Sequence, residues 1–296
     1  MTNERESMLV TIKICGLFVF LILLWIVNLL IPSTRNLDIQ GFNIYEFRLM
    51  ILFYILVIAF STHIIVIKRK FINNSHIMAG IILGTIANFH RLDSIIFLTT
   101  ALSYIASLLI FLDSEVKMIF FKKPTRKKLI IVTSFFTILL ILYYFYYGAL
   151  AILHSFIKAL APGVLEEVIF RMFLFAVSVY IMKGKLYYYN RNKIIVYLIM
   201  IIPFTIYHFA SQAIEFGAMG LFLGILGIAM PFAISPIFTM YIISIILTRV
   251  AIKHDLISAI MIHIFINFIG FIAHSSIENI WQYSVPSMIQ MIFMLL

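Results

Sequence analysis

Residues 164–182 read VLEEVIFRMFLFAVSVYIM, a run as long as a membrane span that is apolar except for three ionisable side chains. These side chains are Glu166, Glu167 and Arg171. A charge near the centre of a bilayer costs roughly 2.5–3.5 kcal/mol on insertion scales, so such residues persist where they pair or face protein, and they usually have a function. Glu167 and Arg171 are four residues apart, so on an α-helix they share a face and neutralise each other. Glu166 lies about 100° further round the helix, which leaves it without a local partner.

The composition of the 296-residue chain indicates a membrane protein. Hydrophobic residues make up 64% of it and charged residues 11%, and the mean hydropathy is +1.11. No soluble domain buries so much apolar surface, so we expect an all-α, polytopic transmembrane helical bundle with about 8–9 spans. The N-terminus lacks a cleavable signal-peptide pattern, so we expect its first span to be retained. The single cysteine, Cys15, excludes an intrachain disulfide.

Apolar runs near 20 residues long mark the expected spans. They lie at 14–31, 49–67, 94–112, 129–147, 164–182, 194–209, 218–247 and 256–273. The run 77–89 is too short to cross unaided, so we expect it to be tilted or re-entrant, and 285–296 is expected to be a C-terminal half-span. Pro231 and Pro236 predict a kink or a break in the overlong run 218–247.

The net charge of +10 is scattered over loops rather than gathered on one face, which argues against a nucleic-acid partner. The loops rich in Lys and Arg lie at 68–70, 117–128, 183–193 and 249–253. By the positive-inside rule these loops are cytoplasmic. The loops at 32–48, 148–163, 210–217 and 274–284 are poor in cations and are expected on the other side. Heavy use of Ile, Lys, Asn and Phe is typical of an AT-rich bacterial genome, so we expect a multi-pass protein of a bacterial plasma membrane.

Two further spans carry polar residues at helical spacing. Phe204 and His208 lie four residues apart late in 194–209, and His263 and Asn267 lie four apart within 256–273. Taken singly, each group has a structural explanation: an ion network that fixes packing, a hydrogen-bonded packing histidine, or a polar pair that joins two helices. The amphipathic run 149–161 is predicted to be an interfacial helix, and Pro162 is predicted to begin the next helix.

Peptide hydrolysis needs an activated water, a stabiliser for the oxyanion and a proton donor for the leaving amine. A carboxylate in a low-dielectric cavity is a competent base near neutrality. Glu166 with His208 could deprotonate a water, and His263 with Asn267 could donate hydrogen bonds to the oxyanion. A serine hydrolase is disfavoured because no Gly-x-Ser-x-Gly elbow occurs.

Together, Glu-Glu-x-x-x-Arg at 166–171, Phe-x-x-x-His at 204–208 and His-x-x-x-Asn at 263–267 resemble the CPBP family. These are the CAAX-processing and bacteriocin-processing (Abi) intramembrane endopeptidases, and the resemblance covers roughly residues 150–275. It implies that Glu166 and His208 activate water while His263 and Asn267 support the intermediate. Glu167, Arg171 and Phe204 would support the site.

The resemblance also implies partners, and the loop 113–128 is the candidate domain boundary. The partners would be a peptide or membrane-protein substrate and the lipid bilayer. We expect N-terminal transmembrane helices over 1–128, a catalytic helical core over 129–284 and a C-terminal apolar half-span over 285–296. A bacterial member would trim leader peptides, pheromone precursors or membrane-protein segments.

Several alternatives remain beside this reading. One zinc ion could be held by Glu166, His208 and His263, although no His-Glu-x-x-His occurs and we expect a metal-free glutamate mechanism without a cofactor. A non-catalytic scaffold or bacteriocin-immunity protein of the same fold would be expected to lose a motif residue, and none is lost. A transporter would be expected to carry inverted repeats, and none is evident in the sequence.

Overall fold

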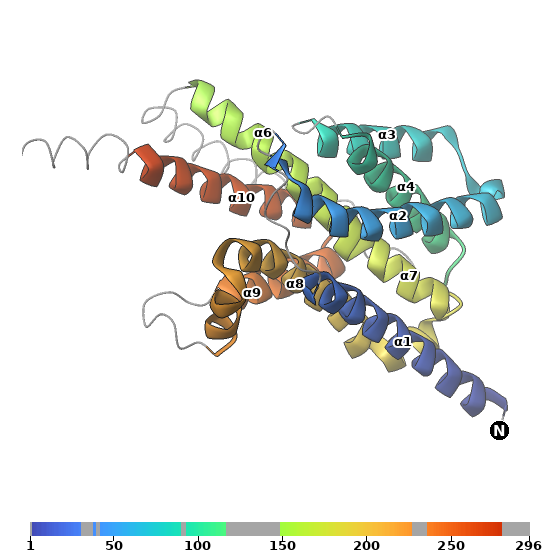
Figure 1. The fold of residues 1–296 in the computed structure, drawn as a ribbon. Helices are drawn as coiled ribbons and strands as arrows, with labels where there is room; N and C mark the ends of the chain where they lie inside the picture. The colour runs from blue at the N-terminus through green and yellow to red at the C-terminus, as the bar shows by residue number, and fades with distance from the viewer. Residues whose placement is uncertain are drawn as a thin grey trace, which may run out of the picture.

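The computed structural model describes residues 2–30, 38–39, 42–89, 93–116, 149–226 and 236–279. Within these ranges the chain is helical apart from short turns and a pair of two-residue strands, β1 (Asp38–Ile39) and β2 (Phe42–Asn43). The helices are α1 (Thr2–Leu30), α2 (Ile44–Ile67), η1 (Arg69–Phe71), α3 (Asn74–Asn88), α4 (Ser94–Leu112), α6 (Ala149–Glu166), η3 (Glu167–Phe173), α7 (Leu174–Ile181), α8 (Leu186–Leu226), α9 (Pro236–Lys253) and α10 (Leu256–Asn279) (Figure 1). The predicted all-α class is confirmed. The predicted spans 129–147 and 285–296 lie outside the described residues.

Two described segments are long and apolar enough to cross a membrane, Glu4–Leu24 and Ser94–Leu112. Shorter apolar helices cover Leu52–Ile67 and Leu256–Ile269. The number of spans, about 8–9 from the apolar runs, stays a prediction. The bounds of α4 agree with its predicted span because Asp93 caps the helix, its side chain accepting a hydrogen bond of 2.8 Å from the backbone N–H of Ile95.

The central element of the fold is a continuous helical segment formed by α6, η3 and α7, which runs from Ala149 to Ile181 (Figure 1). The predictions of a separate interfacial helix at 149–161 and of a helix start at Pro162 are therefore wrong, since Pro162 lies inside α6. A proline removes one backbone hydrogen bond. Here the packing of α6 against α10 and α3 outweighs that loss.

Helix α8 is longer than predicted. It continues through 210–217, where a loop was expected, and ends at Leu226. The polar residues there suggested a loop, but Ala, Gln and Glu are good helix formers. Its 41 residues would span about 60 Å as a straight helix, twice the roughly 30 Å thickness of a bilayer core. The run 218–247 is divided between α8 and α9, and Pro231 lies outside the described residues.

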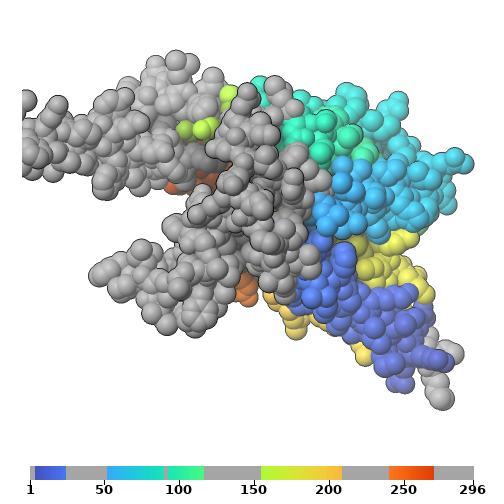
Figure 2. All heavy atoms as spheres, viewed as in Figure 1, coloured from blue at the N-terminus to red at the C-terminus, as the bar shows by residue number. Residues whose placement is uncertain are grey.

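The other helices surround the central segment. Helices α3 and α10 pack along α6, α4 packs along η3 and α7, and α8 packs against α1 and α9. In the space-filling view, side chains of α1 to α4 cover much of one face of the molecule (Figure 2). The motif-bearing segment is thus enclosed by helices from both ends of the chain.

Ion pairs and hydrogen bonds tie several helix ends together at one end of the bundle. They join Lys68 to Asp113, Lys183 to Glu6 (2.6 Å), Lys185 to Glu115 (2.5 Å) and Arg191 to Ser7 (2.7 Å). The turn between α7 and α8 is made by Lys183 and Gly184 in the left-handed region, with φ of 55° and 67°. Two of the predicted cytoplasmic stretches, 68–70 and the start of 183–193, therefore lie at the same end of the molecule.

Candidate active site

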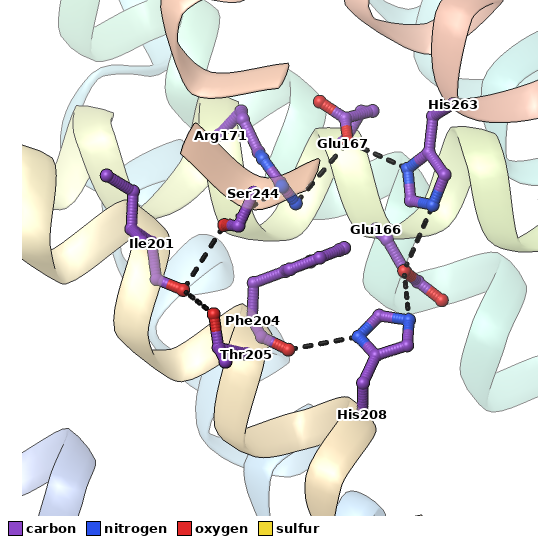
Figure 3. Close-up of polar contacts among 9 residues, drawn as sticks. All are labelled: Glu166, Glu167, Arg171, Ile201, Phe204, Thr205, His208, Ser244 and His263. Atoms are coloured by element: carbon purple, nitrogen blue, oxygen red, sulfur yellow. Dashed lines mark hydrogen bonds and ion pairs between the residues drawn. The ribbon is translucent and has the colours of Figure 1, made fainter. Parts of the chain in front are cut away.

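The site is centred on the Glu166 carboxylate, which lies between two imidazole rings from distant parts of the chain (Figure 3). Its Oε2 is 3.3 Å from Nε2 of His208 on α8 and 3.5 Å from Nε2 of His263 on α10. Glu166 is 5% exposed and His263 is 2% exposed. Glu166 is the last residue of α6, near the middle of the continuous helix, and α10 extends to Asn279. Together these features allow the three side chains to meet.

The other ring nitrogen of each histidine faces an acceptor. Nδ1 of His208 is 3.0 Å from the carbonyl oxygen of Phe204, and Nδ1 of His263 is 2.8 Å from Oε1 of Glu167. Each Nδ1 therefore carries a proton and donates it. In a neutral ring, Nε2 would then present a lone pair to the carboxylate oxygen. Because two acceptors repel at this distance, the group formed by Glu166, His208 and His263 is arranged to hold a proton between its members.

Glu167 and Arg171 form the ion pair predicted from their spacing, with 3.3 Å between Oε1 and Nη1, and both side chains are fully buried. Glu167 also accepts the hydrogen bond from His263, so it joins the cation to the imidazole. The Arg171 guanidinium lies 3.7 Å from the centroid of the Phe204 ring, a close cation–π contact. Its Nη2 donates to Oγ of Ser244, 3.3 Å away on α9. Ser244 was not among the residues predicted for the site, since a serine in an apolar run carries no signal of its own.

The segment Glu167–Phe173 is a π-helix rather than the α-helix predicted throughout 164–182. The backbone N–H of Leu174 accordingly bonds to the carbonyl of Ile169, five residues earlier. Single π-turns inside α-helices occur frequently at functional sites. Here the π-turn begins at the paired carboxylates, and both of them face the histidines of neighbouring helices.

Gly163 allows α6 and α10 to approach closely beside the site. A Cβ atom at this position would lie 2.5 Å from Cγ1 of Ile264, 3.1 Å from its backbone N and 3.2 Å from its Cα. Ile264 follows His263 directly, so this contact fixes how near the imidazole comes to the carboxylates. Gly163 was not among the residues predicted for the site.

Phe204 and Asn267 occupy different places in the site. The fully buried Phe204 ring lies between the Arg171 guanidinium and the imidazoles, 4.3 Å from the His208 ring and 5.7 Å from the His263 ring, centroid to centroid. Asn267 lies one turn beyond His263 on α10 and is half-buried. Asn267 is not among the residues drawn in Figure 3.

A metal site was the alternative for Glu166, His208 and His263. Within the ranges that the structure describes, no group of three or more His, Cys, Asp or Glu is arranged to hold a metal ion.

Comparison with known proteins bears on the C-terminal half of the chain. Residues 148–269 match the family model for type II CAAX prenyl endopeptidase Rce1-like proteins. The matched range contains all three motifs, and the resemblance drawn from them is confirmed. No curated protein and no solved structure matches the chain.

Proposed function

We propose that this protein is an intramembrane endopeptidase, because residues 148–269 match the family model for type II CAAX prenyl endopeptidase Rce1-like proteins. Its substrates are membrane-associated or exported peptides, and a water activated by Glu166 and His208 cleaves them. The observation that carries the proposal is the buried Glu166 oxygen 3.3 Å and 3.5 Å from two imidazole nitrogens. A base, a proton carrier and a hydrogen-bond donor are thereby present around one oxygen.

In this mechanism Glu166 and His208 take the proton of the attacking water and return it to the leaving amine. The Phe204 carbonyl keeps the His208 proton on Nδ1, so Nε2 is the nitrogen that exchanges protons at Glu166. His263 keeps its Nδ1–H on Glu167, so once the ring also takes up the proton held by the group, its Nε2–H donates to the oxyanion. Asn267, on the same helix, supplies the second donor.

The proposed site opens toward the extracytoplasmic leaflet. Glu166 precedes Ile181, the end of α7, by 15 residues, which corresponds to about 20 Å along the helix. The turn after α7 carries Lys183 and Lys185, which the positive-inside rule assigns to the cytoplasm. A site that far from this turn suits a leader or pheromone peptide cut during or after export.

The test compares membrane and secreted peptides from wild-type cells with those from Glu166→Ala and His208→Ala strains. Each substitution is expected to abolish cleavage while the protein still accumulates, because both residues act on one water. The double variant should be little worse than either single variant. Glu115→Ala, which removes an exposed carboxylate paired with Lys185, is the matched control and should cleave normally. Full activity in Glu166→Ala or His208→Ala would refute the assignment.

Chelation tests the alternative role of the same residues. Cleavage by the purified protein is expected to persist in EDTA and phenanthroline. Loss of activity that added zinc restores would instead make Glu166, His208 and His263 zinc ligands, with a zinc-bound water as the nucleophile.

A further inference from the structure

Ser244 is the point where α9, which carries none of the three motifs, contacts the motif residues. Its side chain is fully buried, and its Oγ accepts a hydrogen bond of 3.3 Å from Nη2 of Arg171. The same hydroxyl donates to the carbonyl oxygen of Ile201 at 3.2 Å. Ile201 lies on α8, one turn before Thr205 and two turns before His208. One hydroxyl therefore connects three helical segments (Figure 3).

The two contacts fix the direction of the Ser244 hydroxyl proton. A serine has one proton to donate and lone pairs to accept with. Because a guanidinium has no acceptor and a carbonyl has no donor, the proton must go to Ile201 and the lone pair must face Arg171. An alanine or a valine at this position can make neither contact.

The orientation of the Arg171 guanidinium depends on its hydrogen bond to Ser244. Its Nε and Nη1 have no hydrogen-bond partner among the described residues, and Nη1 is held by the ion pair with Glu167 at 3.3 Å. The contacts described for the guanidinium are this pair, the Phe204 ring and the hydrogen bond to Ser244. A buried cation that loses a hydrogen bond incurs the desolvation cost of that donor, so it is expected to reorient.

We infer that Ser244 is a positioning residue of the proposed peptidase, and that it acts on His263 through Arg171 and Glu167. The inference rests on the function proposed above. Each step is a described contact: Ser244 to Arg171, Arg171 to Glu167, and Glu167 to Nδ1 of His263 at 2.8 Å. Ser244 touches neither imidazole. It fixes the guanidinium that fixes the carboxylate, and the carboxylate holds the His263 proton on Nδ1.

The first measurement is kinetic, on purified full-length protein with a reporter peptide that contains a cleavage site found in the comparison of wild-type and Glu166→Ala cells. Ser244→Ala is expected to lower kcat about tenfold and to change KM less than about twofold, because it disturbs the hydrogen bond of a charged group and no substrate contact. Ser244→Thr keeps the hydroxyl and is expected to retain most of the activity. Valine has the shape of threonine but lacks its hydroxyl. The ratio of the kcat values of Ser244→Thr and Ser244→Val therefore measures the effect of the hydroxyl alone, even if Ser244→Ala folds poorly.

Thr248 provides a matched control on the same helix. It lies one turn after Ser244, is 2% exposed, and its hydroxyl has no hydrogen-bond partner among the described residues. Thr248→Val removes an equally buried hydroxyl of α9 and is expected to leave kcat unchanged.

The second measurement needs no substrate. With isotope-labelled histidine in the reconstituted protein, the ring nitrogens of His263 are assigned by their loss in His263→Gln. The wild type is expected to carry the proton on Nδ1, and Ser244→Val to shift the population toward Nε2–H, while Thr248→Val does not. Equal His263 spectra in the Ser244→Thr and Ser244→Val proteins, or equal kcat values, would overturn the inference. The two proposals can fail separately. If Ser244→Val shifts the His263 tautomer but Glu166→Ala leaves the cellular peptides unchanged, the coupling of Ser244 to His263 is supported and the proposed peptidase activity is refuted.

Discussion

Substitution of Gly163 by alanine tests whether the approach of α6 to α10 sets the geometry of the site. The added Cβ would lie 2.5 Å from Cγ1 of Ile264, whereas carbon atoms rest at about 3.5–4.0 Å. Rotation of the Ile264 side chain does not relieve the strain, since its backbone N and Cα would be 3.1 Å and 3.2 Å away. The backbone of α10 must therefore move.

A retreat of α10 by about 0.5 Å is enough to disturb the network. It would lengthen the 2.8 Å contact between Glu167 and His263 to roughly 3.3 Å, past the usual N–H···O range of about 2.7–3.2 Å. Overpacking of this kind costs about 1–3 kcal/mol of stability. Misplacement of catalytic groups by about 1 Å costs roughly a hundredfold in rate, so we expect kcat of Gly163→Ala to fall between tenfold and a hundredfold.

The assay measures thermal unfolding and reporter-peptide cleavage on the same preparations. Gly80→Ala is the matched control, because its Cβ would lie 2.8 Å from Cγ1 of Ile105 at the α3–α4 contact, away from the site. It should lose stability but keep its kcat. Adding Ile264→Ala to Gly163→Ala removes the nearest clashing atom and should restore part of the stability. Wild-type stability and kcat in Gly163→Ala would refute the claim that this contact holds His263 in place.

Two further predictions concern the buried ion pair and the topology. Arg171→Ala should lower abundance and the unfolding temperature, because it leaves the Glu167 carboxylate buried without its cation, a loss of about 3–5 kcal/mol for a broken buried pair. Adding Glu167→Gln should recover part of that stability, whereas normal stability with only catalysis lost would place Arg171 among the reacting groups. In a Cys15→Ser background, a cysteine at the exposed position Phe89 should react with an impermeant thiol reagent in intact cells, and one at the exposed position Tyr187 should not. The reverse labelling pattern would put the site on the cytoplasmic side.

The parts of the fold that sequence reasoning predicted correctly are those encoded by local chemistry. The all-α class follows from apolar runs, and α4 follows from one such run capped by Asp93. The Glu167–Arg171 pair follows from spacing, since charges four residues apart in an apolar helix have few other partners.

The two incorrect helix bounds have different physical causes. Pro162 is a local signal that a helix begins, yet α6 continues through it, because the packing of α6 against α10 and α3 outweighs one lost hydrogen bond and local sequence does not report that packing. The polar residues of 210–217 suggested a loop, yet α8 continues through them, since Ala, Gln and Glu are good helix formers. The π-turn was not predicted, because the apolar periodicity of 164–182 is compatible with both the i→i+4 hydrogen bonds of an α-helix and the i→i+5 hydrogen bonds of a π-turn.

The candidate site was predictable where its residues carry charge, and not where they are small. Glu166, His208 and His263 stand out because ionisable groups in apolar runs need a reason to be there. Gly163 and Ser244 are common residues in membrane helices. Their roles depend on what lies opposite them, Ile264 in one case and Arg171 in the other.

Because of the π-turn, the orientation of Glu166 depends on the number of residues in this segment as well as on their identity. A π-turn contains one residue more than the α-turn that would replace it. Deletion of Met172 would leave every residue of the three motifs in place. It would, however, allow the segment 167–173 to form a regular α-helix. The helix before it would then turn by about 100° relative to the helix after it, and Glu166 would leave the two imidazoles. A homologous gene can therefore retain each signature residue and still encode a protein whose carboxylate faces away from its histidines.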